Sequence, residues 1–131
     1  FRNCRLKVSL RSAEGDASAV ARRLAASSVL AADAEKLKFP FLIRCWNSGD
    51  WMRPIGTGGK KKLSDIFSDM KLNVDEKEEA VVIVSPGIDG KNTAGEHVAA
   101  VCGYASGKFY CRVDEAVKAS QSTDSLVIIE L

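Results

Sequence analysis

The sequence predicts an α+β fold, a single compact domain with a mixed or largely antiparallel β-sheet or sandwich and a few short helices. Strand-like segments outnumber helical ones, and three of them follow one another late in the chain, at 97–104, 108–113 and 125–131. The connection "ASGK" between the first two is short enough for a β-hairpin. This clustering of late strands favours α+β over an alternating α/β arrangement.

The length of 131 residues fits one domain, because single cores usually occupy roughly 100–200 residues. Hydrophobic residues at 46% and charged residues at 27% are typical of a soluble globular domain, and no apolar run approaches the roughly 20 residues of a membrane span. The first residues, "FRNCRLKV", contain neither an initiator Met nor a signal peptide. We therefore expect residues 1–131 to be one domain of a longer protein, with 1–38 partly a linker or lead-in.

The N-terminal part predicts a strand and a helix. Apolar and polar residues alternate from Cys4 to Leu10, which is the pattern of a half-buried strand. The alanine-rich segment after Asp16 predicts a helix from about Ala17 to Ser27 with Asp16 as a possible N-cap, although a loop is the alternative. A second strand is expected at 39–46, and "NSGDWMRPIGTGG" then consists almost entirely of turn-forming residues.

A short amphipathic helix is predicted by "LSDIFSDM". Its apolar residues recur at the spacing of one helix face: Leu63, Ile66, Phe67 and Met70. Three lysines at 60–62 precede this helix, where the helix dipole favours anions, so the arrangement would attract an external anion. Further along, Asp75 is a possible cap for a brief helical turn, and "AVVIVS" is typical of a buried strand.

Positive charge is concentrated in the middle of the chain. The net charge is +2, but residues 1–35 contribute +2, residues 36–77 contribute +4 and residues 78–131 contribute −4. A local basic surface is expected where phosphates must be neutralised, although a solvated basic face is the simpler alternative.

The four cysteines, at 4, 45, 102 and 111, include no Cys-x-x-Cys pair, so a zinc site of the usual spacing is not expected. Cys102 and Cys111 could form a disulfide across adjacent strands. Reduced, mostly buried cysteines in a cytoplasmic protein are the favoured interpretation.

The sequence offers little from which to build an active site. His97 is the single histidine, and we expect it to be structural, since no catalytic motif surrounds it. Asp65 and Asp69 could hold a metal or share a proton, but two solvated helix carboxylates are the simpler interpretation. We therefore expect neither catalytic residues nor metal ligands in this chain.

The stretch "GTGGKKKLS" does not have the spacing of a P-loop, because Gly56 and Gly59 are too close together and Lys60 is followed by Lys61. A KH-type single-stranded RNA-binding module, with a Gly-x-x-Gly loop at 56–59, is the alternative. Such a loop should follow a helix, whereas turn-forming residues precede this one.

The segment "FPFLIRCWNSGDWMRPIGTGGKKKLSDIFSDMKLNVDEKEEAVVIVS" resembles the C-terminal domain of the bacterial tRNA(Ile)-lysidine synthetases. That family shows an Ile-Arg pair, a Gly-Asp, a Pro-x-Gly, a Lys-Lys and an Asp-x-Phe-x-Asp-x-Lys in this order. The matching residues are Ile43 and Arg44, Gly49 and Asp50, Pro54 and Gly56, Lys61 and Lys62, then Asp65, Phe67, Asp69 and Lys71. The resemblance covers roughly residues 29–113.

This resemblance implies a cytoplasmic ligase of tRNA modification. The complete enzymes use ATP, with Mg²⁺ implied, and L-lysine to convert the wobble cytidine of tRNA(Ile) to lysidine. The catalytic N-terminal domain carries a Ser-Gly-Gly-x-Asp-Ser loop that this chain lacks, so we expect the fragment to be inactive alone and to need no cofactor. Its implied partners are the acceptor stem of tRNA(Ile) and the N-terminal catalytic domain of the same chain, with no membrane and no DNA.

The resemblance also implies which residues hold the RNA. The expected tRNA contacts are Arg44, Arg53, Lys60, Lys61, Lys62, Lys71 and Lys77. The expected orienting carboxylates are Asp50, Asp65 and Asp69.

Two departures from the family pattern stand out. Thr57 replaces a common Met, and Tyr104, Ala105 and Ser106 occupy a late strand where the family carries an arginine. A second RNA-contacting surface on that strand is therefore in doubt.

Overall fold

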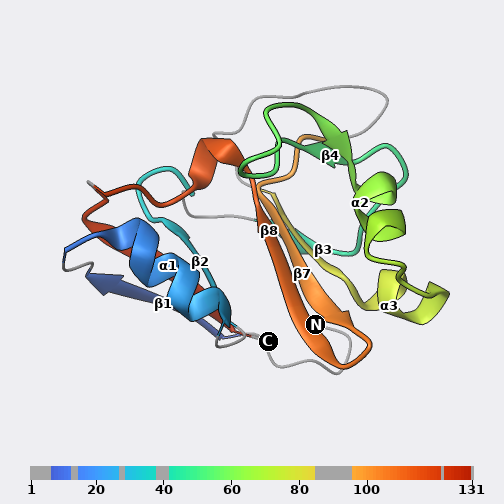
Figure 1. Ribbon diagram of the computed structural model, residues 1–131, viewed down its shortest axis with the longest axis horizontal. Coiled ribbons are helices and arrows are strands. Elements are labelled where there is room, and N and C mark those ends of the chain that lie inside the picture. Colours follow the sequence, from blue (N-terminus) through green and yellow to red (C-terminus); the bar gives the residue numbers. More distant parts are fainter. Residues whose placement is uncertain are drawn as a thin grey trace.

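A computed structural model of the chain describes residues 7–12, 15–26, 29–37, 42–84, 96–121 and 123–130. These residues form four layers in the order helix, sheet, sheet, helices (Figure 1). One outer layer is α1 (Ala17–Ala26), and the other contains α2 (Leu63–Asp69) and α3 (Val74–Glu79). All strand pairs within the sheets are antiparallel, which confirms the predicted α+β class.

The N-terminal sheet has the strand order β1-β9-β2. Its strands are β1 (Lys7–Ser12), β9 (Ser125–Glu130) and β2 (Val29–Asp33). One face packs against α1 through residues such as Ala31 and Ile128, and the other contributes Leu30 and Val127 to the core shared with the second sheet. β9 therefore joins the last residues of the chain to the first elements.

The predicted N-terminal helix is confirmed as α1, and Ser27 lies outside the described residues. Asp16 caps it, because its Oδ1 accepts hydrogen bonds from the amides of Ser18 and Ala19 at 3.0 and 3.3 Å. Of the strand predicted from Cys4, residues 7–10 belong to β1, and the first three lie outside the described part. β1 is exposed along its length and not half-buried, because the core clusters on the two faces of this sheet are built from β2 and β9 and include no residue of β1.

The second sheet has the order β3-β6-β7-β8, with bounds Leu42–Arg44, Val81–Val84, Ala100–Ala105 and Lys108–Val113. Its residues alternate between two cores. Val81 and Ile83 pack towards the first sheet, and Val82 packs towards α2. The predicted hairpin between β7 and β8 is confirmed, with Gly107 at φ 80° in the turn.

Two predicted strands are shorter than expected. Of the strand at 39–46, only Leu42–Arg44 pairs with a neighbour, and 39–41 lie outside the described residues. The strand expected from His97 begins at Ala100, because His97 instead bridges to Trp51.

α2 has the predicted apolar stripe. Leu63, Ile66 and Phe67 are buried and Met70 is half-buried in the core between α2 and the second sheet. α3 follows at once, and its N-cap is Asn73, not Asp75 as predicted. Asn73 forms a capping box, in which its side chain accepts from the amide of Glu76 and the Glu76 carboxylate accepts from the amide of Asn73, at 2.8 and 3.0 Å.

The cysteines that the structure describes, Cys45, Cys102 and Cys111, are free thiols. Cys102 and Cys111 are direct partners in the register of β7 and β8, yet they are not bonded. Burial raises the pKa of Cys102 to about 12 and also raises that of Cys111. Both thiols are therefore protonated at neutral pH, as expected for structural cysteines.

Candidate nucleic-acid interface

The lysines at 60–62 are presented by a tight loop. β4 (Trp51–Met52) pairs with β5 (Lys61–Lys62) in a two-stranded ribbon, and residues 53–62 are here called the basic loop. Gly56 and Gly58 take φ values of 86° and 74°, which other residues rarely adopt. The amide and hydroxyl of Thr57 both bond the carbonyl of Pro54, at 3.2 and 2.9 Å, and close the turn.

Two of the three lysines thus lie in a strand, and Lys62 is also the N-cap residue of α2, without a side-chain cap bond. The first amide of the helix, on Leu63, donates to the carbonyl of Asp50 at 2.9 Å. Because a backbone carbonyl already satisfies that amide, the attraction for anions comes mainly from the lysine side chains.

The Trp51 side chain packs against two residues of the basic loop, Arg53 and Lys60. Its indole stacks on the His97 ring with centroids 4.1 Å apart and planes 13° apart. The Nζ atom of Lys60 lies 4.4 Å from the indole centroid, and the guanidinium carbon of Arg53 lies 5.1 Å away. Since the imidazole covers one face, Lys60 lies over the opposite face, and a cation–π contact holds it there.

Asp114 ties this stack to the second sheet. Its Oδ1 lies 2.7 Å from His97 Nε2 and accepts the amide of Arg53 at 2.6 Å, while Oδ2 accepts the amide of Ala116 at 2.8 Å. Asp114 and His97 are both buried. This position between the loop and η1 (Glu115–Val117) fits the structural role expected for His97.

Arg44 and Asp50 form a second anchor. The Arg44 guanidinium binds both carboxylate oxygens of Asp50 at 2.8 and 3.0 Å and also Glu96 at 2.8 Å. Hydrogen bonding to Asp50 raises the pKa of Arg44 above its usual value. Asp50 is only 1% exposed and accepts the amide of Asn47 at 2.7 Å. Arg44 is therefore engaged inside the protein, and Asp50 fixes the position of its guanidinium group.

The remaining predicted residues lie at different distances from the loop. Lys61 forms an ion pair with Asp69, whereas Asp65 is exposed on the outer face of α2. Lys71 follows the C-terminal end of α2 and Lys77 lies in α3, at the opposite end of α2 from β4 (Figure 1). The structure therefore brings together Arg53 and the three lysines, and sets Lys71 and Lys77 apart by the length of α2, about 10 Å.

Arg112 is a basic residue near the loop, on the late strand where a second RNA-contacting surface was in doubt. It is exposed on β8 and lines a small cavity of about 180 Å³ with Lys61, Asp69 and Pro54. The position of Arg112 follows from the alternation of side chains along the strand "KFYCRV". Arg112 lies on the same face as Tyr110, which packs towards α2.

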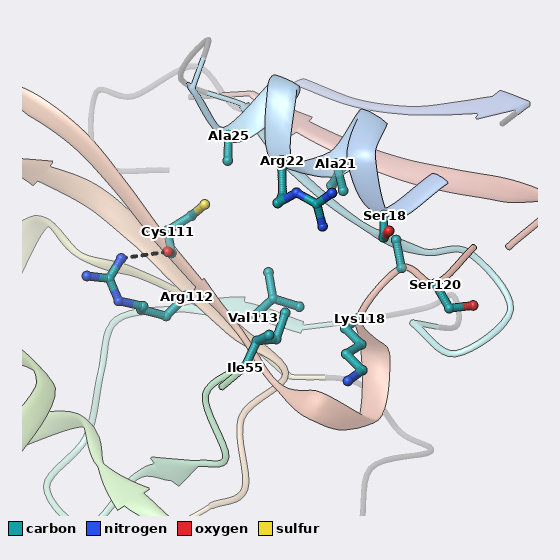
Figure 2. A pocket seen from close by; sticks show the side chains of 12 residues that line it. Ser18, Ala21, Arg22, Ala25, Ile55, Cys111, Arg112, Val113, Lys118 and Ser120 are labelled. Atoms are coloured by element: carbon teal, nitrogen blue, oxygen red, sulfur yellow. Dashed lines mark hydrogen bonds between the residues drawn. The ribbon is translucent and has the colours of Figure 1, made fainter. Parts of the chain in front are cut away.

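A larger cavity of about 520 Å³ lies between α1, β8 and the basic loop (Figure 2). Ala21 and Ala25 of α1 form one wall, and Ile55 and Val113 form another.

No group of three or more His, Cys, Asp and Glu side chains in the described ranges is close enough to hold a metal ion. No described helix is long and apolar enough to cross a membrane.

The topology decides against a KH module. β3 ends at Arg44, a loop follows, and β4 leads into the turn at Gly56. Within residues 42–62, which are all described, no helix precedes the glycines. A KH loop requires such a helix, so this alternative is wrong.

The chain is similar to curated proteins of one kind. The tRNA(Ile)-lysidine synthase of Parabacteroides distasonis is 49% identical over 53 residues, which are 40% of this chain and 12% of that protein. The enzyme of the same name from Bacteroides thetaiotaomicron is 34% identical over 86 residues, 66% of this chain and 18% of the relative. This chain is a relative of the tRNA(Ile)-lysidine synthases.

A third tRNA(Ile)-lysidine synthase, from Geobacter sulfurreducens, is 28% identical over 99 residues, 76% of this chain and 18% of that enzyme. The resemblance inferred from the sequence motifs is thereby confirmed. The chain matches only 12 to 18% of the length of these synthases. No family model matches the chain. No solved structure matches it significantly.

Proposed function

We propose that this chain is the tRNA-binding domain of a cytoplasmic tRNA(Ile)-lysidine synthase and holds the acceptor stem of the tRNA. The relatives' names supply the enzyme class, a ligase that modifies tRNA(Ile). The observation that carries the binding role is the basic loop, which presents Arg53, Lys60, Lys61 and Lys62 on one ribbon fixed by buried side chains.

The physical chemistry of an acceptor stem suits this loop. A-form RNA is recognised mainly through phosphates and sugar hydroxyls across its surface, so side chains that donate charge from a rigid loop are appropriate. Lys60 and Lys62 are exposed, and neither forms an ion pair within 4.0 Å with a described residue. Their charges are therefore available to phosphates, with Lys61 and Arg53 beside them.

Catalysis belongs, in this proposal, to the rest of the enzyme. ATP, Mg²⁺ and L-lysine would bind to an N-terminal catalytic domain that partners this one. The residues described here do not fit a Mg²⁺ site, since they include no cluster of carboxylates and other ligands that could hold a metal. We therefore assign them the task of holding RNA and no chemical step.

Replacing Lys60, Lys61 and Lys62 together by Ala tests the role of the loop. We expect weaker binding of the acceptor-stem minihelix and a flatter salt dependence, because each lost phosphate contact removes at most about 0.9 from the slope of log K against log salt. Filter binding across a range of salt concentrations measures both.

The matched control replaces three lysines outside the loop, Lys7, Lys36 and Lys108, by Ala. It removes the same charge from the protein but should leave the slope close to that of the unchanged chain. An unchanged slope in the loop variant, or an equal change in the control, would refute a specific contact role for the loop.

A further inference from the structure

The cavity of about 520 Å³ beside α1 has the size of a small-molecule site, since such pockets usually enclose roughly 300–1,000 Å³. It lies between two layers of the fold, with α1 on one side and β8 on the other (Figure 2). An RNA double helix is far too wide to enter it, but a single nucleotide would fit.

The walls of the cavity are apolar, with a few polar groups. Ala21, Ala25, Ile55 and Val113 supply apolar surface, and Ser18 and Ser120 add hydroxyl groups. The residues that line the cavity include no carboxylate. The nearest carboxylates named by the contacts are Asp16, which accepts from the Ser18 hydroxyl, and Glu115, which is neutralised by Lys118.

Arg22 supplies a cation to this site. The hydrogen bond from Ser18 lowers the pKa of Asp16, and the charge of Arg22 also helps to lower it. It reaches from α1 over the cavity, opposite Val113 and Ile55 (Figure 2). It forms no ion pair within 4.0 Å with any residue in the described part of the chain. Lys118 is paired with Glu115 at 2.6 Å, and Arg112 donates to the Cys111 carbonyl at 2.9 Å on the far side of β8.

The cavity adjoins the basic loop directly. Ile55 belongs to the loop and lines the cavity, and Arg112 lines both this cavity and the smaller one next to Lys61. A strand of RNA whose phosphates contact Lys61 would therefore have the cavity within reach of its next unpaired residue.

We propose that this cavity binds one unpaired nucleotide of the RNA held by the basic loop, an inference that rests on the proposed function. The faces of a base would contact the alanines and Val113, and the oxygen of Ser18, whose hydroxyl hydrogen is donated to Asp16, would accept from its edge. The Arg22 guanidinium would stack on the base or pair with its phosphate, as arginines do in single-strand recognition. Paired nucleotides cannot enter, so the site distinguishes the end of a stem from its interior.

The test compares two RNA minihelices that differ only at one end. One has a blunt acceptor stem, and the other carries a short unpaired 3′ overhang. We expect the 131-residue chain to bind the overhang RNA about tenfold more tightly, the factor that one base contact of ordinary strength supplies. Arg22→Gln should abolish that preference, and Arg23→Gln should keep it, because the neighbouring Arg23 is exposed and does not line the cavity.

Equal affinity for the two RNAs, or the same loss in both variants, would overturn this inference and leave the proposed function intact. Failure of both RNAs to bind would contradict the proposed function and overturn this inference with it. As a second measurement, photocrosslinking from a 4-thiouridine in the overhang should label peptides from 17–26 or 111–120. Labelling elsewhere alone would contradict the location.

Discussion

Asp114 shows how much a single buried carboxylate does in this domain. It contacts His97 and accepts the amides of Arg53 and Ala116, so one side chain links the stack beneath the loop, the loop backbone and η1. Sequence alone did not point to it, because its partners are up to 61 positions away along the chain. Only the folded chain brings these groups to one carboxylate.

Replacing Asp114 by Ala should reduce the free energy of unfolding by about 2–5 kcal/mol. The change leaves two partly buried amides without their acceptor and removes the buried contact with His97, and each such loss costs about 1–3 kcal/mol. Urea unfolding measures the difference. Asp65→Ala is the control, since Asp65 is exposed on α2 and should change stability by less than about 0.5 kcal/mol. Equal stability of the Asp114 variant and the unchanged chain would show that these bonds contribute nothing.

Individual residues also show that a sequence does not reveal contacts between distant parts of the chain. A contact of Arg44 with RNA stays a prediction, and in the folded chain both of its terminal nitrogens bond Asp50 or Glu96. Glu96 is 52 positions away from Arg44 along the chain, and no local sequence pattern predicts that the two residues pair. Lys60 and Lys62, in contrast, are exposed.

Helices and strands that are marked by a pattern among neighbouring residues could be predicted from the sequence. The stripe of α2 repeats at helical spacing, and the hairpin of β7 and β8 is marked by its turn, so both follow from neighbouring residues. β2, β4 and β5 were not predicted. β4 and β5 have two residues each, and β2 pairs with a strand nearly 100 positions later, so their pairing depends on distant segments.

The link between α3 and the β7–β8 turn should depend on pH. The Glu76 carboxylate accepts the amides of Asn73 and Ser106, and these bonds lower its pKa below the usual 4.5. A depressed carboxylate pKa adds stability that is fully present above the unfolded-state value and is lost as pH falls through the folded-state value.

Comparing the unchanged chain with Glu76→Gln tests this coupling. The free energy of unfolding of the unchanged chain should exceed that of the variant at pH 7, and the gap should close as pH falls below about 4. Denaturant unfolding at several pH values gives the curve. A gap that stays constant across this range would mean that the charge of Glu76 does not contribute.

At the scale of the whole molecule, two sheets packed face to face bury the main core, and helices cover both outer faces. The basic loop belongs to the β4–β5 ribbon and is bridged through Pro54 to Asp114 at the end of β8, and the larger cavity lies between that loop and α1. The α+β class was predictable because late strands dominate the sequence. The sequence left one sheet and a sandwich both open, because the choice depends on whether β9 pairs with β8 or, as observed, joins β1 and β2.

The central claim is that this domain holds the acceptor stem of tRNA(Ile). The most direct test measures the affinity of the 131-residue chain for an acceptor-stem minihelix and for an anticodon-stem minihelix of equal length at the same salt concentration. The account predicts clearly tighter binding of the acceptor stem, with protection of its phosphates in footprinting. Equal affinity for both stems, or tighter binding of the anticodon stem, would contradict it.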